Sequence, residues 1–232
     1  MRKINKKFVV ISLGGSIVVP SPCQVNVKFL KEFRQLILGY LKKGWRFIIT
    51  VGGGKTNLAY NESAKRITKI KNIDLDWLGI AVTKLNAELL RVIFADNAYQ
   101  EVLVNPTVKI KVNKPIIIAS GWLPGCSTDK DAVLWAKNIK AKIVINLTNI
   151  DYVYDKDPNK FSQAKPLKKL SWDEYRNLIG GKWEPRMNVP FDPVAAKIAQ
   201  KIGLKVIVMN GQKLNNLRNF LAGKKFIGTV IG

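Results

Sequence analysis

Three glycine-containing segments are the places where this chain could bind an anion. They are SLGGS at residues 12–16, VGGGK at 51–55 and GWLPGCSTD at 121–129. Because glycine has no Cβ, the backbone N–H groups of such loops can approach a phosphate closely, and Lys55 adds a positive charge beside the second loop. One glycine turn after a strand is often only a tight connection, but three of them together favour phosphate binding.

The glycine spacing excludes two common nucleotide-binding motifs. Gly54-Lys55-Thr56 resembles the end of a P-loop, but that motif needs a glycine where the chain has Ile49. The dinucleotide-binding pattern needs a third glycine where the chain has Asn57. We therefore expect neither a P-loop NTPase nor a dehydrogenase.

The composition narrows the chemistry further. The chain has 232 residues and no histidine, which excludes histidine-based triads, general bases and metal sites. Cys23 and Cys126 could form one disulfide at most, and we expect both to be reduced. No apolar run reaches the roughly 18 residues of a membrane helix, and the N-terminal apolar stretch is too short for a signal peptide, so we expect a cytoplasmic protein.

The net charge of +23, from 39 Lys and Arg against 16 Asp and Glu, has two explanations. A basic surface attracts nucleic acid. However, the lysines are spread along the whole chain, without zinc-finger spacing or a compact arginine cluster, and the richness in Lys, Ile and Asn is typical of A/T-rich coding. We favour the coding explanation and a small anionic substrate, and we do not expect nucleic acid to be the partner.

The glycine loops follow strands of a predicted α/β fold. Apolar runs predict strands at residues 8–13, 46–51, 101–104, 116–119, 142–147, 205–209 and 226–231. Helical spacing and caps predict helices at 27–41, 77–94, 129–138, after Ser171, from Pro193 to about 203, and at 214–221. This alternation predicts a mainly parallel sheet with helices on both faces, in one domain spanning residues 1–232.

Seven segments in matching order make the chain similar to the amino-acid kinase superfamily, and within it to the archaeal-type uridylate (UMP) kinases. They are LGGSIVVP at 13–20, VGGGK at 51–55, DWLGIAVTKLNAELL at 76–90, PGCSTDKDAV at 124–133, NLTNIDYVYDKDP at 146–158, FDPVAAKIA at 191–199 and GTVI at 228–231. The resemblance implies a three-layer α/β/α sandwich, a hexamer, and transfer of the ATP γ-phosphoryl group to UMP. It also implies two lobes, an N-terminal one for UMP and a C-terminal one for ATP.

The resemblance also assigns residues to the two nucleotides. On the ATP side it implies Ser12, Leu13, Gly14, Gly15, Ser16 and Gly53 at the phosphates, with Thr148, Asn149, Tyr154 and Asp157 nearer the adenosine. For UMP it implies Gly52 at the phosphate, Asp76 at the ribose, and a loop around the nucleotide formed by Gly121, Trp122, Leu123, Pro124, Gly125, Cys126, Ser127 and Thr128. Asp129 matches the acidic residue that organises the basic groups around the transferred phosphate.

Three positions depart from the family pattern. Ser12 stands where many members have lysine, Asn57 and Leu58 where an arginine is usual, and Trp122-Leu123 where Thr-His is frequent. Lys55 is our candidate for the missing catalytic charge. We expect no dedicated metal site, because Asp151, Asp155 and Asp157 lie in a turn-rich segment; Mg²⁺ would come with the nucleotide.

Simpler structural roles remain open for several acidic and hydroxyl residues. Asp76 and Asp192 could be helix caps, and Thr128 could cap the next helix with Asp131 completing a capping box. Asp129 and Asp131 could be solvated carboxylates in a first helical turn. Two other functions of the fold also remain: a kinase for another small acid or phosphate, such as acetylglutamate, and a non-catalytic binding or storage protein. The absence of histidine weighs against an isopentenyl phosphate kinase.

Overall fold

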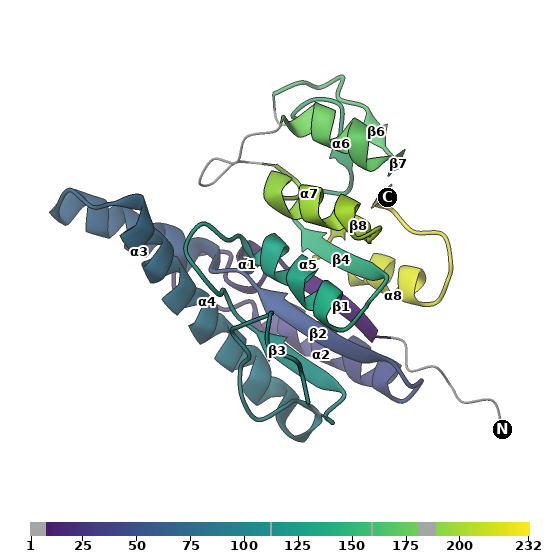
Figure 1. Ribbon diagram of the computed structural model, residues 1–232, viewed down its shortest axis with the longest axis horizontal. Helices are drawn as coiled ribbons and strands as arrows, with labels where there is room; N and C mark the ends of the chain where they lie inside the picture. Colours follow the sequence, from purple (N-terminus) through teal and green to yellow (C-terminus); the bar gives the residue numbers. More distant parts are fainter. Residues whose placement is uncertain (1–7, 112, 159, 181–188) are drawn as a thin grey trace.

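A seven-stranded, mainly parallel sheet forms the centre of the molecule in the computed structural model, which describes residues 8–111, 113–158, 160–180 and 189–232. The strand order is β3-β2-β1-β4-β8-β9-β7 (Figure 1). Its strands are β1 (Phe8–Leu13), β2 (Arg46–Val51), β3 (Ile116–Ala119), β4 (Ile143–Thr148), β7 (Lys169–Leu170), β8 (Lys205–Asn210) and β9 (Thr229–Ile231). Among the described strands of this sheet, only β8 and β9 pair in antiparallel orientation, and β5 (Val153–Tyr154) pairs with β6 (Pro166–Leu167) in a separate hairpin.

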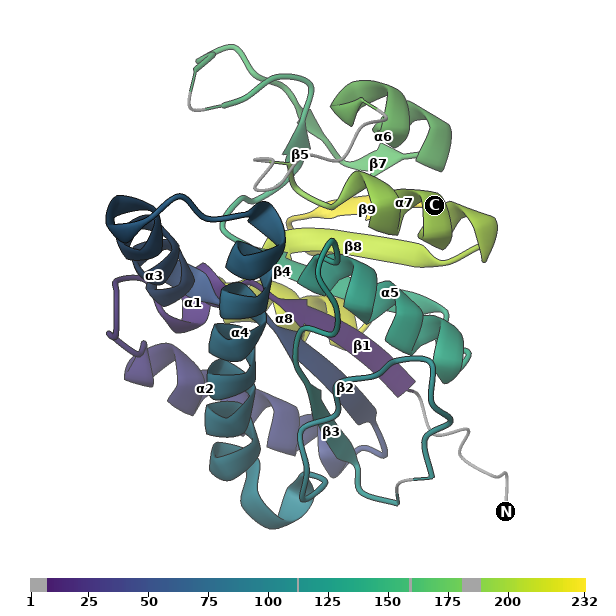
Figure 2. The ribbon, with the colours of Figure 1, turned by 60° about the vertical axis from the view of Figure 1, so that its left-hand side comes forward.

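Helices cover both faces of the sheet because its strands are apolar on both sides. In β1, Val9 and Ile11 belong to one buried cluster and Val10 to the other. The first face carries α1 (Gly15–Val18), α2 (Val27–Leu41), α4 (Asn72–Phe94) and α8 (Leu214–Leu221); the second carries α5 (Thr128–Asn138), α6 (Trp172–Ile179) and α7 (Pro193–Lys201). The expected three-layer α/β/α sandwich is confirmed (Figure 2).

The register of the central strands brings their carboxyl ends together. Leu13 pairs with Val51 of β2 on one side and with Leu147 of β4 on the other, so β1, β2 and β4 end at the same level. The turns that follow are in direct contact. Gly14 N–H donates to the Leu147 carbonyl at 2.8 Å, and Gly52 N–H donates to the Leu13 carbonyl at 3.0 Å.

Three sequence predictions need correction. The long helix α4 begins at Asn72 rather than at residue 77, so Asp76 lies inside the helix and the interpretation of Asp76 as a cap is wrong. The strand expected at 101–104 is wrong, since only Leu103 pairs, as an isolated bridge to Ala119. The last strand is β9 at Thr229–Ile231, shorter than expected.

Two further elements complete the description. Helix α3 (Gly54–Ile67) starts directly from the second glycine turn and packs on α4, and a 3₁₀ turn, η1, spans Ala95–Asn97. Among the described helices, none is long and apolar enough to cross a membrane.

The contact between the glycine turns predicts a strong effect of one methyl group. A Cβ at Gly15 would overlap the backbone of Gly52 and Gly54. We therefore expect Gly15→Ala to lower the free energy of unfolding by about 3 kcal/mol or more, because rigid backbone must move. Gly39→Ala is the control, since Gly39 lies inside α2 with open space around it and alanine favours a helix there. Equal urea-unfolding midpoints for the two variants would contradict this packing.

Candidate active site

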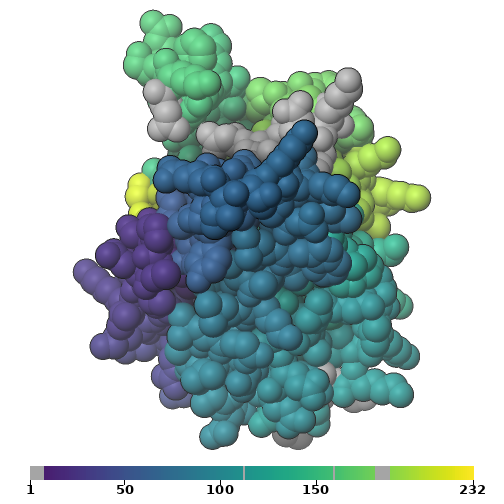
Figure 3. Space-filling view, turned by 90° about the vertical axis from the view of Figure 1, so that its left-hand side faces the viewer, coloured from purple at the N-terminus to yellow at the C-terminus, as the bar shows by residue number. Residues whose placement is uncertain are grey.

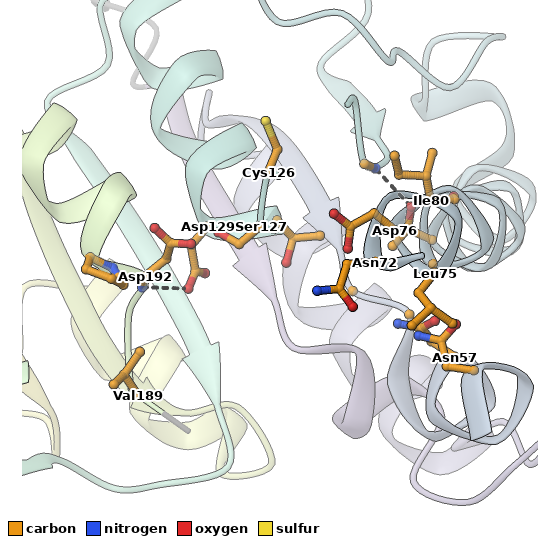
Figure 4. Close-up of a pocket in the computed structure, with 18 of the residues that line it drawn as sticks. Asn57, Asn72, Leu75, Asp76, Ile80, Cys126, Ser127, Asp129, Val189 and Asp192 are labelled. Carbon is orange, nitrogen blue, oxygen red and sulfur yellow. Dashed lines mark hydrogen bonds between the residues drawn. The ribbon is translucent and has the colours of Figure 1, made fainter. Parts of the chain in front are cut away.

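A cavity of about 710 Å³ opens at the carboxyl ends of the strands. It is lined from α3 and α4 by Asn57, Asn61, Lys65, Asn72, Leu75, Asp76, Gly79, Ile80 and Thr83, and from the turns, α5 and the start of α7 by Gly52, Gly53, Gly121, Cys126, Ser127, Thr128, Asp129, Val189, Asp192 and Pro193. Asp129 and Asp192 lie on one side, opposite Asp76 and Asn72 (Figure 4). Figure 3 shows the side of the molecule on which α3 lies, and side chains of α3 and the start of α4 occupy the centre of that side. The place is the one where open α/β sheets bind ligands.

Asp129 links three elements at the edge of this cavity. The Ser12 hydroxyl at the end of β1 donates to Asp129 Oδ1 at 2.8 Å, and the Asp192 backbone N–H donates to Oδ2 at 3.3 Å. Asp192 itself caps α7 by accepting from Ala195 N–H at 2.8 Å, as expected for a cap, and it also lines the cavity. The carboxyl group of Asp129 is therefore held from both sides.

The start of α5 differs from the capping alternative. Ser127, not Thr128, is the N-cap: its hydroxyl accepts from Lys130 N–H at 3.1 Å. Asp131 is fully buried and accepts from the Trp122 backbone N–H at 3.2 Å, so it completes no capping box. Thr128 and Cys126 line the cavity beside this cap. Both cysteines are free thiols, and Cys23 is exposed.

Burial changes the acidity of two carboxyl groups. Desolvation raises the pKa of Asp129 from 3.8 to about 7, although the Ser12 hydrogen bond acts in the opposite direction; the nearby Asp192 charge adds to the rise. Desolvation likewise raises the pKa of Asp131 to about 7, while the Trp122 N–H and the charge of Lys130 lower it. Asp131 is fully buried, so the interpretation of that residue as a solvated first-turn carboxylate is wrong, whereas Asp129 keeps part of its surface exposed at the cavity.

The loop from Gly121 to Thr128 is fixed by side chains at its backbone N–H groups. Thr83 Oγ1 accepts from Gly121 N–H at 3.0 Å, and Asp76 Oδ2 accepts from Gly125 N–H at 2.9 Å. Gly121, Cys126, Ser127 and Thr128 face the cavity, whereas Trp122, Leu123, Pro124 and Gly125 are not among its lining residues. The structure thus brings both ends of the expected substrate loop to the cavity.

The two glycine turns take different places at the site. Gly52 and Gly53 line the cavity, and their carbonyl groups accept from Asn86 Nδ2 at 2.8 and 3.2 Å. Leu13, Gly14, Gly15 and Ser16 are not among the lining residues, and Gly14 and Gly15 pack behind Gly52 and Gly54. Ser12 reaches the site through its bond to Asp129.

The lysine of α3 that lines the cavity is not the one predicted from the sequence. The exposed Lys55 does not line the cavity, whereas Lys65 does. Asn57 and Asn61, one helical turn apart, also line it, and the side-chain oxygens of both are buried without a hydrogen-bond partner among the residues that the structure describes. Sequence reasoning missed Asn61, Lys65 and Asn86; their only signal was a polar residue recurring at helical spacing on α3 and an asparagine inside an apolar stretch of α4.

A second cavity of about 350 Å³ lies beside the first. Four residues predicted for the ATP side line it together: Thr148, Asn149, Tyr154 and Asp157. Val189 lines both cavities, so the two are neighbours. Within the described ranges, no group of three or more Asp, Glu, Cys or His residues could hold a metal ion.

The raised pKa of Asp131 predicts a pH effect on stability. A carboxyl group that binds its proton more tightly when folded makes stability fall as pH rises from about 4 to about 7. Asp131→Asn removes this loss and keeps an acceptor for Trp122 N–H. Urea unfolding should therefore show the stability of Asp131→Asn rising relative to that of the wild type by about 2.5 kcal/mol between pH 5 and pH 8. A difference that is the same at both pH values would contradict a raised pKa.

Comparison with known proteins agrees with this architecture. Residues 7–210 match the amino acid kinase family. A uridylate kinase from Sulfolobus acidocaldarius is 33% identical over 215 residues, covering 89% of this chain and 92% of the relative. Another from Methanocorpusculum labreanum is 33% identical over 227 residues, covering 97% and 95%.

Solved structures show the same arrangement. The crystal structure of uridylate kinase from Archaeoglobus fulgidus superposes with a TM-score of 0.82 at 31% identity, covering 97% of this chain and 99% of that one. The UMP kinase from Bacillus anthracis shares the fold, with a TM-score of 0.77 at 23% identity over 97% and 96% of the two chains. The chain therefore belongs to the amino acid kinase family.

Proposed function

We propose that the protein is a UMP kinase, which transfers the γ-phosphoryl group of ATP to UMP and gives ADP and UDP, in cytoplasmic synthesis of pyrimidine nucleotides. The observation that carries this proposal is the pair of neighbouring cavities that share Val189. Two nucleotides held there would meet phosphate to phosphate near the glycine turns. The relatives and the solved structure above 30% identity that match nearly the whole chain are named uridylate kinases.

The larger cavity suits UMP. Gly52, which the resemblance assigns to the UMP phosphate, lines this cavity beside the start of α3, where the helix N-terminus favours an anion; Gly53, which the resemblance assigns to the ATP phosphates, lines it as well. Asp76 is held by Gly125 N–H through one carboxylate oxygen, and its second oxygen can accept from a ribose hydroxyl. Ribose binding would then also steady the loop that follows Gly121, whose cavity-facing residues would surround the base.

The smaller cavity suits the adenosine of ATP. Tyr154 would offer an aromatic face to adenine, and Asp157, which also lines this cavity, would accept from the adenosine. Thr148 and Asn149, at the end of β4, lead from there towards the turn at residues 12–16, where the phosphates would lie. The Gly14 N–H donates a hydrogen bond to the Leu147 carbonyl, so this turn and the end of β4 form one surface.

Transfer to a phosphate oxygen needs little proton abstraction, so positioning and charge stabilisation would supply most of the rate. Asp129 would orient donors around the transferred group, with Ser12 holding it on one side. Lys65 is in place at the cavity, whereas Lys55 would have to turn in from solvent, and its catalytic role stays a prediction.

Mg²⁺ fits this site as an ion carried by the nucleotide. Within the part of the chain that the structure describes, carboxylates do not gather into a set of three or more that could enclose a cation. Mg²⁺ usually binds through substrate phosphates, waters and one or two carboxylates, and Asp129 would be such a carboxylate at the larger cavity. The ion would neutralise charge on the phosphates.

We also propose that the chain forms a homo-oligomer, a hexamer by family resemblance. Helix α4 exposes an apolar stripe, with Ile73 at 54%, Trp77 at 49%, Leu85 at 66% and Val92 at 59% of their surface. Such a stripe is typical of a protein interface. Sedimentation should give a mass that is a multiple of 26.0 kDa, and a monomer at micromolar concentration would contradict the proposal.

A substrate panel tests the proposed activity. With ATP and Mg²⁺, ADP release should require UMP. It should exceed the release with CMP by about 10-fold or more, because the different hydrogen-bonding groups of cytosine would leave polar groups of the site without a partner. Equal turnover of CMP or acetylglutamate, or ADP release that ignores the acceptor, would contradict a UMP kinase. UMP binding without ADP release would favour the non-catalytic alternative.

The panel has a matched pair of variants on α4. Asp76→Asn should raise the KM for UMP by about 10-fold and leave that for ATP unchanged, since a charge-assisted hydrogen bond to the ribose is lost. Asp74→Asn, at an exposed position of the same helix, should change neither.

A further inference from the structure

The segment Val189–Pro193 forms a wall shared by the two cavities; we call it the shared wall. Val189 lines both cavities, Pro190 lines the smaller one, and Asp192 and Pro193 line the larger one. A displacement of this segment would therefore change both nucleotide sites together.

Side chains from three different elements hold the shared wall. Asn146 of β4 donates from Nδ2 to the Pro190 carbonyl at 2.8 Å. Tyr175 of α6 holds the next residue: its hydroxyl donates to the Phe191 carbonyl at 2.6 Å and accepts from the Phe191 N–H at 2.8 Å. The following N–H, of Asp192, donates to Asp129.

The surroundings of Tyr175 fix its hydroxyl group at the backbone of Phe191. Its side chain is fully buried, and its ring packs edge-on against Trp172 with a centroid distance of 6.2 Å. Burial raises the pKa of Tyr175, so the hydroxyl keeps its proton and remains a donor at any physiological pH. One hydroxyl thus satisfies both backbone groups of Phe191 inside an apolar core, where an unpaired group is costly.

We propose that Tyr175 is a positioning residue for phosphoryl transfer: through Phe191 it holds the shared wall and keeps the Asp192 N–H on the Asp129 carboxylate. A continuous chain of hydrogen bonds follows, from Tyr175 through the Phe191 backbone and Asp192 N–H to Asp129 and Ser12. It connects α6, which does not line the larger cavity, to the end of β1. The kinetic part of this proposal rests on the proposed kinase activity.

The link to Asp129 gives the proposal a titration readout. Asp129 is faced by the Ser12 hydroxyl from β1, by the Asp192 N–H and carboxylate from the start of α7, by Asp131 within α5, and by the Tyr175 hydroxyl from α6. The Asp192 N–H favours the ionised carboxylate, whereas Asp192 and Asp131 carry like charge. If the N–H moves away, the pKa of Asp129 should rise.

The test compares Tyr175→Phe with Tyr40→Phe. Tyr40 is also a buried tyrosine whose hydroxyl donates to a backbone carbonyl, that of Arg218 at 2.8 Å, but it lies between α2 and α8. Tyr175→Phe should lower kcat for UMP by about 10-fold or more with KM values changed less than about 3-fold, because a small misplacement near reacting groups is costly. Tyr40→Phe should leave kcat unchanged.

A second measurement needs no nucleotide. Carboxyl-carbon NMR of the ligand-free protein should show Asp129 titrating at higher pH in Tyr175→Phe than in the wild type, and at the same pH in Tyr40→Phe. Unchanged kcat and an unchanged Asp129 titration in Tyr175→Phe would overturn the proposal. A wild type inactive on UMP, with the titration shifted as expected, would contradict only the kinase activity.

Hydrogen exchange covers the case in which Tyr175→Phe does not fold. In the wild type, the amide protons of Phe191 and Asp192 should exchange as slowly as those of strand β8. Exchange as fast as that of an exposed loop would overturn the proposal, because it would show that Tyr175 does not hold the wall.

Discussion

The structure depends on close backbone contact between glycine turns at the ends of parallel strands. No side chain fits at Gly15, because the backbones of Gly52 and Gly54 occupy the space where its Cβ would lie. Gly54 also adopts a positive φ of 66°, which only glycine takes easily as α3 begins. This packing is possible because β1 pairs in parallel register with both β2 and β4, so that the three turns stand at one level.

The two cavities follow from this contact. The turn after β2 opens into the larger cavity, and the end of β4 opens into the smaller one. Asp129 and the shared wall lie where they meet, tied to β1 by Ser12 and to α6 by Tyr175. If the two glycine turns bind phosphates as proposed, a sheet that places them side by side needs few charged side chains to bring two phosphates together, which suits a chain with serine at residue 12 instead of lysine.

The sequence allows most of the frame to be predicted, because strands buried on both faces appear as apolar runs such as FVVISL and RFIITV. The start of α4 at Asn72 could not be predicted, because Asn72 and Asp74 among its first residues are exposed and polar and show no apolar helical spacing. The contact between α3 and α4 is visible only in the folded structure. Asn61, Asn86 and Tyr175 could not be predicted as site residues, because their roles come from contacts across the fold. The position of Lys55 beside three glycines favours a role at the phosphates, but the direction of its side chain depends on how α3 leaves the turn, and the side chain is exposed.

The most direct measurement is calorimetric binding of a dinucleotide in which adenosine and uridine are joined through five phosphates. If the turns hold two nucleotides end to end, one such molecule should bind per chain and exclude both UMP and a non-hydrolysable ATP analogue. Its affinity should exceed that of either nucleotide by about 100-fold, because the second half binds intramolecularly. Affinity no greater than that of the ATP analogue alone, or binding that leaves the UMP site open, would contradict the end-to-end arrangement.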